Sequence, residues 1–161
     1  MMIVILMGVS GAGKTTIGKL LAESLGWSFY DGDDFHPEAN IEKMRSGVPL
    51  TDADREGWLT ALQGLERSLE RERRDAVISC SALKQVYRDR LQNSQTVCFV
   101  YLKGSYDLIL GRLKQRRDHF MTSELLQSQF ETMEEPRGVL TVDICQPPQA
   151  VVREIMRALK L

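Results

Sequence analysis

The 161-residue sequence has few of the residues from which disulfide frameworks and metal clusters are built. It has three cysteines and two histidines. Cys80, Cys98 and Cys145 are odd in number and widely separated, and each lies in or at the end of an apolar run. Neither disulfides nor a metal cluster is therefore expected, and the three cysteines are predicted to be reduced core residues. A catalytic thiol is disfavoured because only His36 and His119 could act as its base.

The sequence also lacks a charge imbalance and a long hydrophobic run. Lys and Arg number 21 and Asp and Glu number 22, which gives a formal charge of −1. No global field therefore favours nucleic acid or an anionic membrane. The apolar run near the start is too short for a signal peptide or a membrane span. We expect a cytoplasmic protein with a small-molecule partner, folded as a single domain over residues 1–161.

The most informative feature that is present follows the first apolar run. Residues 3–7 lead directly into a G-x-x-x-x-G-K-T sequence, where a strand would be followed by a helix. The glycines allow backbone N–H groups to close around an anion, Lys14 reaches the β- and γ-phosphates, and the Thr15 hydroxyl can hold Mg²⁺. The sequence therefore predicts a nucleotide-binding phosphate loop made of Gly8, Val9, Ser10, Gly11, Ala12, Gly13, Lys14 and Thr15.

Strand and helix patterns alternate along the rest of the chain. Apolar runs predict further strands at residues 27–30, 75–80, 96–102 and 139–145. Apolar stripes predict helices at residues 15–25, 83–92, 106–117, 123–133 and 150–159, and another that begins with a capping box at residues 51–54. Buried strands that alternate with helices are typical of a doubly wound α/β fold, so we expect a five-stranded parallel sheet flanked by helices. Ligands then bind at the carboxyl ends of the strands.

Acidic residues follow the second predicted strand. Asp33 could accept or orient the proton of an attacking hydroxyl, and Asp31 could bind a water of the Mg²⁺ shell. Alternate residues at a strand end point the same way, so both carboxylates are expected on one side. They lie beside the phosphate loop if the second strand neighbours the first or the third. A surface turn rich in Asp and Gly is the alternative.

Basic residues form two further groups. Arg112 and Arg116 lie four apart on a predicted helix, so both guanidinium groups share one face and suit a helical lid over the moving phosphate, in the region 112–135. The second group would suit an anionic substrate such as a carboxylate, and it consists of Arg55, Lys84, Arg88 and Arg90. Solvated surface charge is the alternative for each residue.

Two common classes of phosphate-loop protein lack support. A regulatory GTPase needs a guanine-reading Asn-Lys-x-Asp segment, which the sequence lacks. A motor or assembly ATPase usually has an aspartate after the third strand, where this chain has Ser79-Cys80-Ser81. The pattern favours a small-metabolite kinase with a P-loop kinase fold.

Several segments, distributed from the first strand to the last, resemble the gluconokinase family. They are residues 31–37 (DGDDFHP), 40–44 (NIEKM), 47–52 (GVPLTD), 80–84 (CSALK), 119–121 (HFM) and 128–131 (SQFE). The resemblance implies ATP-dependent phosphorylation of D-gluconate at its 6-hydroxyl, with ATP and Mg²⁺ as cofactors, and a tendency to form homodimers. A kinase for another small acid, such as shikimate, and a non-catalytic nucleotide-binding module are the alternatives.

The resemblance also implies roles for individual residues. The phosphate loop, including Thr15, would hold ATP and Mg²⁺, and Asp33 would face the acceptor hydroxyl. The gluconate pocket would include His36, Arg55, Lys84 and Arg88, and the lid would include the catalytic Arg112 and Arg116 together with His119. The family's acidic loop after Glu135-Pro136 is shortened here. We therefore expect this chain to differ from the family in nucleotide preference or affinity, and to keep the same core chemistry.

Overall fold

The computed structural model describes residues 1–116 and 122–161, and its centre is a sheet of parallel strands. The strands are β1 (Ile3–Met7), β2 (Ser28–Asp31), β3 (Ala76–Ser79), β4 (Val97–Lys103) and β5 (Leu140–Asp143). Their order across the sheet is β2-β3-β1-β4-β5, and every neighbouring pair is parallel. The predicted five-stranded parallel sheet is confirmed, and β2 neighbours β3 as the placement of Asp31 and Asp33 requires.

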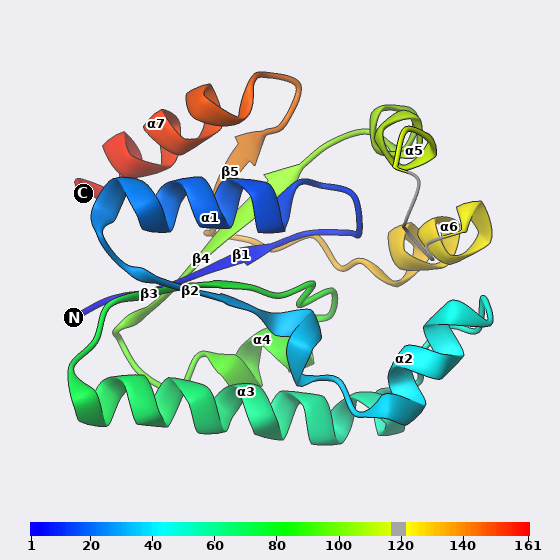
Figure 1. Ribbon diagram of the computed structural model, residues 1–161, viewed down its shortest axis with the longest axis horizontal. Coiled ribbons are helices and arrows are strands. Elements are labelled where there is room, and N and C mark those ends of the chain that lie inside the picture. Colours follow the sequence, from blue (N-terminus) through cyan, green and yellow to red (C-terminus); the bar gives the residue numbers. More distant parts are fainter. Residues whose placement is uncertain (117–121) are drawn as a thin grey trace.

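Helices cover both faces of this sheet (Figure 1). Helices α1 (Lys14–Leu25) and α7 (Pro148–Leu159) lie on one face, and α3 (Asp52–Glu72) and α4 (Gln85–Leu91) lie on the other. Alternate strand residues point to the two layers: Val4 packs with the α1 and α7 layer, whereas Ile3 and Ile5 pack with the α3 and α4 layer. Because both faces are buried, β1 is apolar throughout.

The remaining helices gather at the carboxyl ends of the strands (Figure 1). They are the 3₁₀ turn η1 (Gly32–Phe35) and the helices α2 (Glu38–Arg45), α5 (Tyr106–Lys114) and α6 (Ser123–Thr132). The sequence patterns do not predict α2, because its few apolar residues form no stripe. The predicted helix over residues 106–117 is too long, since α5 ends at Lys114 and Arg116 lies beyond it, where its N–H donates to the Leu113 carbonyl at 3.1 Å.

Two other expectations have clear outcomes. The capping box that opens α3 is confirmed, because Asp54 N donates to Thr51 Oγ1 at 3.1 Å and Thr51 N donates to Asp54 Oδ2 at 2.9 Å. The prediction of three core cysteines is wrong in part. Cys80 is buried, but Cys98 is partly exposed and Cys145 is exposed on the segment after β5. Among the described residues, no helix is both long enough and apolar enough to cross a membrane.

A buried carboxyl joins α3 to the segment before β4. Glu66 is 1% exposed, and its Oε2 accepts a hydrogen bond from Asn93 Nδ2 at 2.7 Å. One turn further on, Glu70 accepts hydrogen bonds from Ser94 and Thr96. Burial raises the pKa of Glu66 to about 8, and the neighbouring Glu70 acts in the same direction. This carboxyl therefore holds its proton well above the pH at which an exposed glutamate loses it.

Candidate active site

The phosphate loop joins β1 to α1. Gly11 and Gly13 have φ values of +81° and +91°, a conformation that L side chains rarely adopt. Among the described residues, no hydrogen-bond acceptor is paired with the main-chain amides of Gly11, Gly13, Lys14 or Thr15. The Lys14 ammonium crosses the loop and donates to the carbonyls of Gly8 and Val9 at 3.0 and 2.9 Å. Free amides at a helix N-terminus beside a lysine form an anion-binding site.

Asp31, at the end of β2, is held against this loop. Its carboxylate accepts hydrogen bonds from Thr15 Oγ1 at 2.9 Å, Ser79 Oγ at 3.1 Å and the Asp33 amide at 3.0 Å. Thr15 can donate to Asp31 and still offer oxygen lone pairs on its other side. Hydroxyl and carboxylate oxygens are the hard ligands that suit Mg²⁺, so the pair fits the metal role that the sequence predicts.

Asp33 lies beside Lys14, but the reason given for its orientation is wrong. It belongs to η1 and not to β2, so strand alternation does not apply. The backbone at Gly32 is pressed against β3, where a Cβ would meet the Ser79 carbonyl oxygen at 2.2 Å. The buried Trp58 indole N–H donates to the Gly32 carbonyl at 2.7 Å and fixes the turn from the other side. A glycine and a tryptophan therefore direct Asp33 toward the loop.

The charges of Asp33 and Lys14 perturb each other. Solvent reaches the Asp33 side chain, yet protein atoms surround it closely, and this desolvation raises the pKa of Asp33 while Lys14 opposes the shift. Desolvation likewise lowers the pKa of Lys14, and Asp33 opposes that shift. Each group thus stabilises the charged form of the other, which is typical of a functional site.

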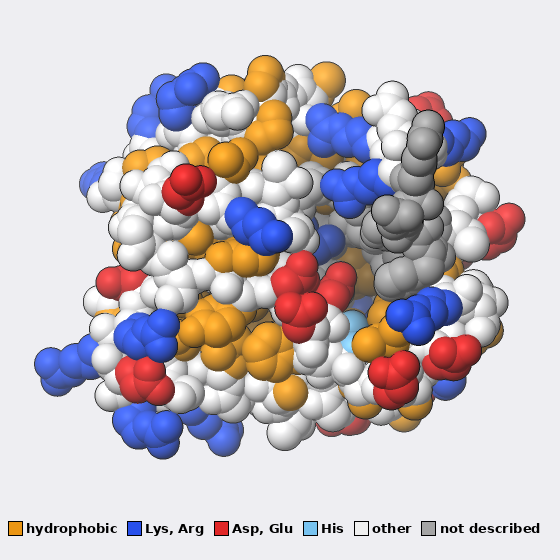
Figure 2. Space-filling model, viewed as in Figure 1, with side chains coloured by type: hydrophobic (Ala, Val, Ile, Leu, Met, Phe, Trp, Pro, Cys, Tyr) orange, Lys and Arg blue, Asp and Glu red, His pale blue; other side chains and the backbone are white. Residues whose placement is uncertain are grey.

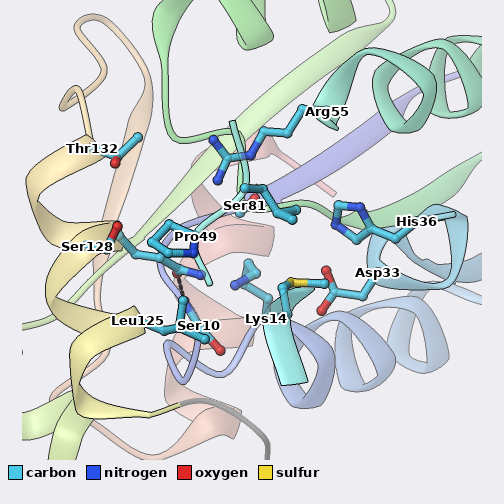
Figure 3. A pocket seen from close by; sticks show the side chains of 13 residues that line it. Ser10, Lys14, Asp33, His36, Pro49, Arg55, Ser81, Leu125, Ser128 and Thr132 are labelled. Carbon is cyan, nitrogen blue, oxygen red and sulfur yellow. Dashed lines mark hydrogen bonds between the residues drawn. The ribbon is translucent and has the colours of Figure 1, made fainter. Parts of the chain in front are cut away.

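Lys14 and Asp33 form the floor of a cavity, which we call the aspartate pocket (Figure 3). Its wall comes from η1, from the segment around α2 and from α3, and its roof comes from α6. Figure 2 shows a hollow in the right half of the view, with acidic and basic side chains around its rim. The lining residues are Ser10, Lys14, Asp33, His36, Met44, Pro49, Leu50, Arg55, Ser81, Leu125, Ser128, Gln129 and Thr132.

His36 enters this pocket as a neutral donor. Its ring stacks on Trp58 with centroids 4.4 Å apart. Asn40 Nδ2 donates to the Asp54 carbonyl at 2.8 Å and contacts His36 Nδ1 at 3.2 Å. An amide nitrogen can only donate, so Nδ1 accepts and the ring proton is assigned to Nε2. Burial, together with the charge of Arg55, lowers the pKa of His36 to about 4, which keeps the ring neutral at physiological pH.

Arg55 provides the positive charge in the wall of the pocket. Its Nη1 donates to the Tyr87 hydroxyl at 3.0 Å, and that hydroxyl donates to Asp52. Lys84 also pairs with Asp52, at 2.9 Å. Arg55 and Lys84 therefore belong to one network, but only Arg55 lines the aspartate pocket. Lys84 supports the network from outside the pocket, contrary to the direct role that the resemblance implies.

Arg88 does not have the substrate-binding position expected from the sequence. Its side chain is buried, and its guanidinium donates to the carbonyls of Ala82 at 2.8 Å, Leu83 at 3.1 Å and Glu134 at 2.8 Å. It also bonds Gln85 Oε1 at 3.0 Å. Its donors therefore point into the protein and join the segment after β3 to the segment after α6. Arg90, the fourth member of this basic group, is paired with Glu56 at the surface.

A second cavity, the arginine pocket, lies on the other side of the phosphate loop. Arg112 and Arg116 both line it, although only Arg112 is helical, and Arg112 Nη2 donates to the Ile144 carbonyl at 2.6 Å. The other lining residues are Gly11, Gly13, Thr16, Ile17, Ile144, Gln146, Pro148 and Val151. An apolar wall beside two cations and a phosphate loop suits a nucleotide base and its phosphates. His119, also expected in this region, lies outside the described residues.

The roof of the aspartate pocket is the part of the site that residue chemistry did not reveal. Leu125, Ser128, Gln129 and Thr132 have the i, i+3, i+4, i+7 spacing of one helical face, and all four line the pocket. That spacing, with polar residues at three of the four positions, was the available signal. Ser81, another lining residue, lies within the 80–84 motif that resembles the gluconokinase family, but no role was assigned to it.

A phosphate loop, an acidic strand end and a roofed pocket beside them define a small-molecule kinase of the P-loop class. The shikimate kinase family model matches residues 10–160. The thermoresistant gluconokinase of Escherichia coli (strain K12) is 45% identical over 163 residues, which cover 98% of this chain and 93% of that protein. The chain belongs to the gluconokinase family, as its motifs predicted.

Among solved structures, a gluconokinase is more similar to this chain than a shikimate kinase is. A gluconokinase from Sinorhizobium meliloti 1021 matches with a TM-score of 0.90 and 44% identity, over 99% of this chain and 91% of that one. A shikimate kinase from Bacteroides thetaiotaomicron matches with a TM-score of 0.72 and 20% identity, over 99% of each chain. The second likeness shows the fold alone.

Proposed function

We propose that this protein transfers the γ-phosphoryl group of ATP to the 6-hydroxyl of D-gluconate and releases 6-phospho-D-gluconate and ADP. One observation carries the proposal: Lys14 of the phosphate loop, Asp33 and the cationic Arg55 line the same pocket. An acidic sugar needs a cation for its carboxylate and hydrogen-bond partners for its hydroxyls, and this pocket offers both. The identity with relatives named gluconokinases supports the same substrate.

On the acceptor side, the reaction depends on how the attacking hydroxyl is positioned. Asp33 accepts the hydrogen bond of the attacking hydroxyl and orients its oxygen toward the phosphate held by the loop. Lys14 favours the ionised form of Asp33, which that task requires. Arg55 faces the carboxylate end of the acceptor, and the His36 Nε2–H donates to one of its hydroxyls. Most of the rate enhancement then comes from positioning and electrostatics.

The nucleotide side uses the other half of the site. The loop amides and Lys14 hold the phosphates, and the arginine pocket takes the base, with Arg112 and Arg116 beside the phosphate chain. Thr15 and Asp31 fit Mg²⁺, and when bound the ion would neutralise charge on the phosphate oxygens. The region 112–135, which contains α6, then acts as a lid over the acceptor.

The test is ADP release from purified protein with Mg²⁺ and ATP, measured with D-gluconate, shikimate, glucose and no acceptor at equal concentrations. Turnover with gluconate alone is the expected result. Turnover with shikimate alone would move the chain to the second candidate, which the family-model match favours. ATP binding without acceptor-dependent turnover would leave a nucleotide-binding module. A cytoplasmic location and a homodimeric state stay predictions, and size-exclusion chromatography tests the homodimeric state.

A further inference from the structure

One hydrogen bond joins the phosphate loop to the roof of the aspartate pocket. The Ser10 amide donates to Gln129 Oε1 at 2.7 Å, between residues 119 positions apart in the sequence (dashed in Figure 3). Both residues line the pocket together with Lys14 and Asp33. Within the described part of the chain, no other hydrogen bond connects α6 with the phosphate loop.

A neighbouring side chain and the far end of α6 are fixed by different contacts. Leu126, which does not line the pocket, is fully buried in the core layer of α1 and α7. Just after α6, the Glu134 amide donates to the Leu83 carbonyl at 2.8 Å, and the Glu134 carboxylate accepts from the Gln85 amide at 2.8 Å. These contacts hold the end of the helix to the segment after β3. The bond from Gln129 instead sets the middle of the helix relative to the phosphate loop.

This hydrogen bond therefore lies between the sites proposed for the two substrates. The Ser10 amide belongs to the loop that encloses the phosphates, and Gln129 shares its helical face with Ser128 and Thr132, which line the acceptor pocket. We expect a ligand on the loop to order Ser10 and a ligand under α6 to order Gln129. Each ligand thus removes part of the freedom that the other would otherwise have to restrict, which is the thermodynamic basis of coupled binding.

We propose that Gln129 is a positioning residue that couples the two substrate sites by holding α6 over the acceptor in register with the phosphate loop. The proposal rests on the proposed function in taking nucleotide and sugar acid as the two ligands. Its consequence is that the acceptor binds more tightly when the phosphate loop is filled. Loss of one hydrogen bond of this kind changes an equilibrium roughly 2- to 10-fold.

The experiment measures D-gluconate binding by calorimetry, with and without a saturating non-hydrolysable ATP analogue and Mg²⁺. Gln129→Met removes the acceptor oxygen and keeps the side-chain volume. Gln127→Met is the matched control, because Gln127 is exposed on the same helix and bonds only Glu131 among the described residues. The dissociation constant of gluconate without the analogue, divided by its value with the analogue, should exceed one in the wild type and in Gln127→Met. It should fall about 2- to 10-fold in Gln129→Met.

Steady-state kinetics separate coupling from general damage. In Gln129→Met the KM for gluconate at saturating ATP and the KM for ATP at saturating gluconate should rise by similar factors, because coupling between two binding sites is reciprocal, while the melting temperature stays near the wild-type value. A wild-type ratio of one, or an unchanged ratio in Gln129→Met, overturns the proposal. If the acceptor panel identifies another acid, gluconate fails as the substrate, and the same ratio measured with that acid still decides the role of Gln129.

Discussion

Replacing Arg88 with methionine should destabilise the protein and leave acceptor binding nearly intact. The resemblance places Arg88 in the substrate pocket, whereas the structure buries it and directs its donors to the carbonyls of Ala82, Leu83 and Glu134. Methionine keeps most of the aliphatic volume and removes every one of these donors. The two roles therefore predict opposite outcomes for the same variant.

The size of the effect follows from the contacts. Three carbonyl groups lose charged hydrogen-bond donors, and removing one member of a buried charged network costs about 3–5 kcal/mol. For a domain of this size, 1 kcal/mol corresponds to a shift of about 2–4 °C in Tm, so the Tm should fall by roughly 6–20 °C. The control is Arg90→Met in the same helix. The partly exposed Arg90 pairs with Glu56 and also donates to Thr60 and Gln63, and the loss of these contacts should cost less than the loss of the buried Arg88.

Thermal unfolding followed by circular dichroism measures the stability of both variants. Kinetics at a temperature where Arg88→Met is fully folded should give a KM for gluconate within about threefold of the wild type, since the lost bonds are worth little to binding. A KM raised tenfold or more, with the wild-type Tm, would refute the structural role and restore Arg88 to the substrate site.

Three further variants test other parts of the argument. Lys14→Met should keep the fold and lower kcat by at least about 100-fold because the transferred phosphoryl group loses its nearest cation; wild-type turnover would remove Lys14 from the mechanism. Tyr87→Phe takes the hydroxyl partner from Arg55 and should raise the KM for gluconate roughly 2- to 10-fold without changing the KM for ATP, and equal changes in both constants would count against it. The third variant is Glu66→Gln. Folding raises the pKa of Glu66 from 4.5 to about 8, so between these pH values the folded state holds a proton that the unfolded state has lost. The free energy of unfolding should therefore fall by up to about 1.4 kcal/mol per pH unit as the pH rises through this window, and urea titrations at pH 6 and pH 8 should find this slope only in the wild type.

Features encoded by neighbouring residues could be predicted from the sequence. The apolar runs gave the strands, the capping box gave the start of α3, and the spacing of Gly8, Gly13 and Lys14 gave the phosphate loop. Each of these signals lies within a few residues, so no knowledge of tertiary contacts is needed. Because ligands bind at the carboxyl ends of parallel strands, the sequence also predicted that Asp31 lies beside the loop.

Features that depend on distant contacts could not be predicted. Arg88 turns inward, where the carbonyls of Ala82 and Leu83 accept from its guanidinium, and Ala82 has a left-handed φ of 44°. An alanine gives no sequence signal for that conformation. The orientation of Asp33 similarly depends on Trp58, 25 positions away. Here the sequence placed Asp33 beside the phosphate loop for a reason that the structure does not support.

The order of the strands has a consequence for how such a protein can diversify. β1 lies at the centre of the sheet, with β3 and β2 on one side and β4 and β5 on the other. Asp33 and Ser81 of the acceptor side follow β2 and β3, whereas Arg112 and Ile144 of the nucleotide side follow β4 and β5. Substitutions that adapt the protein to a new acid can therefore accumulate after β2, after β3 and in α6, while the segments that carry Arg112 and Ile144 keep their contacts with the proposed phosphoryl donor.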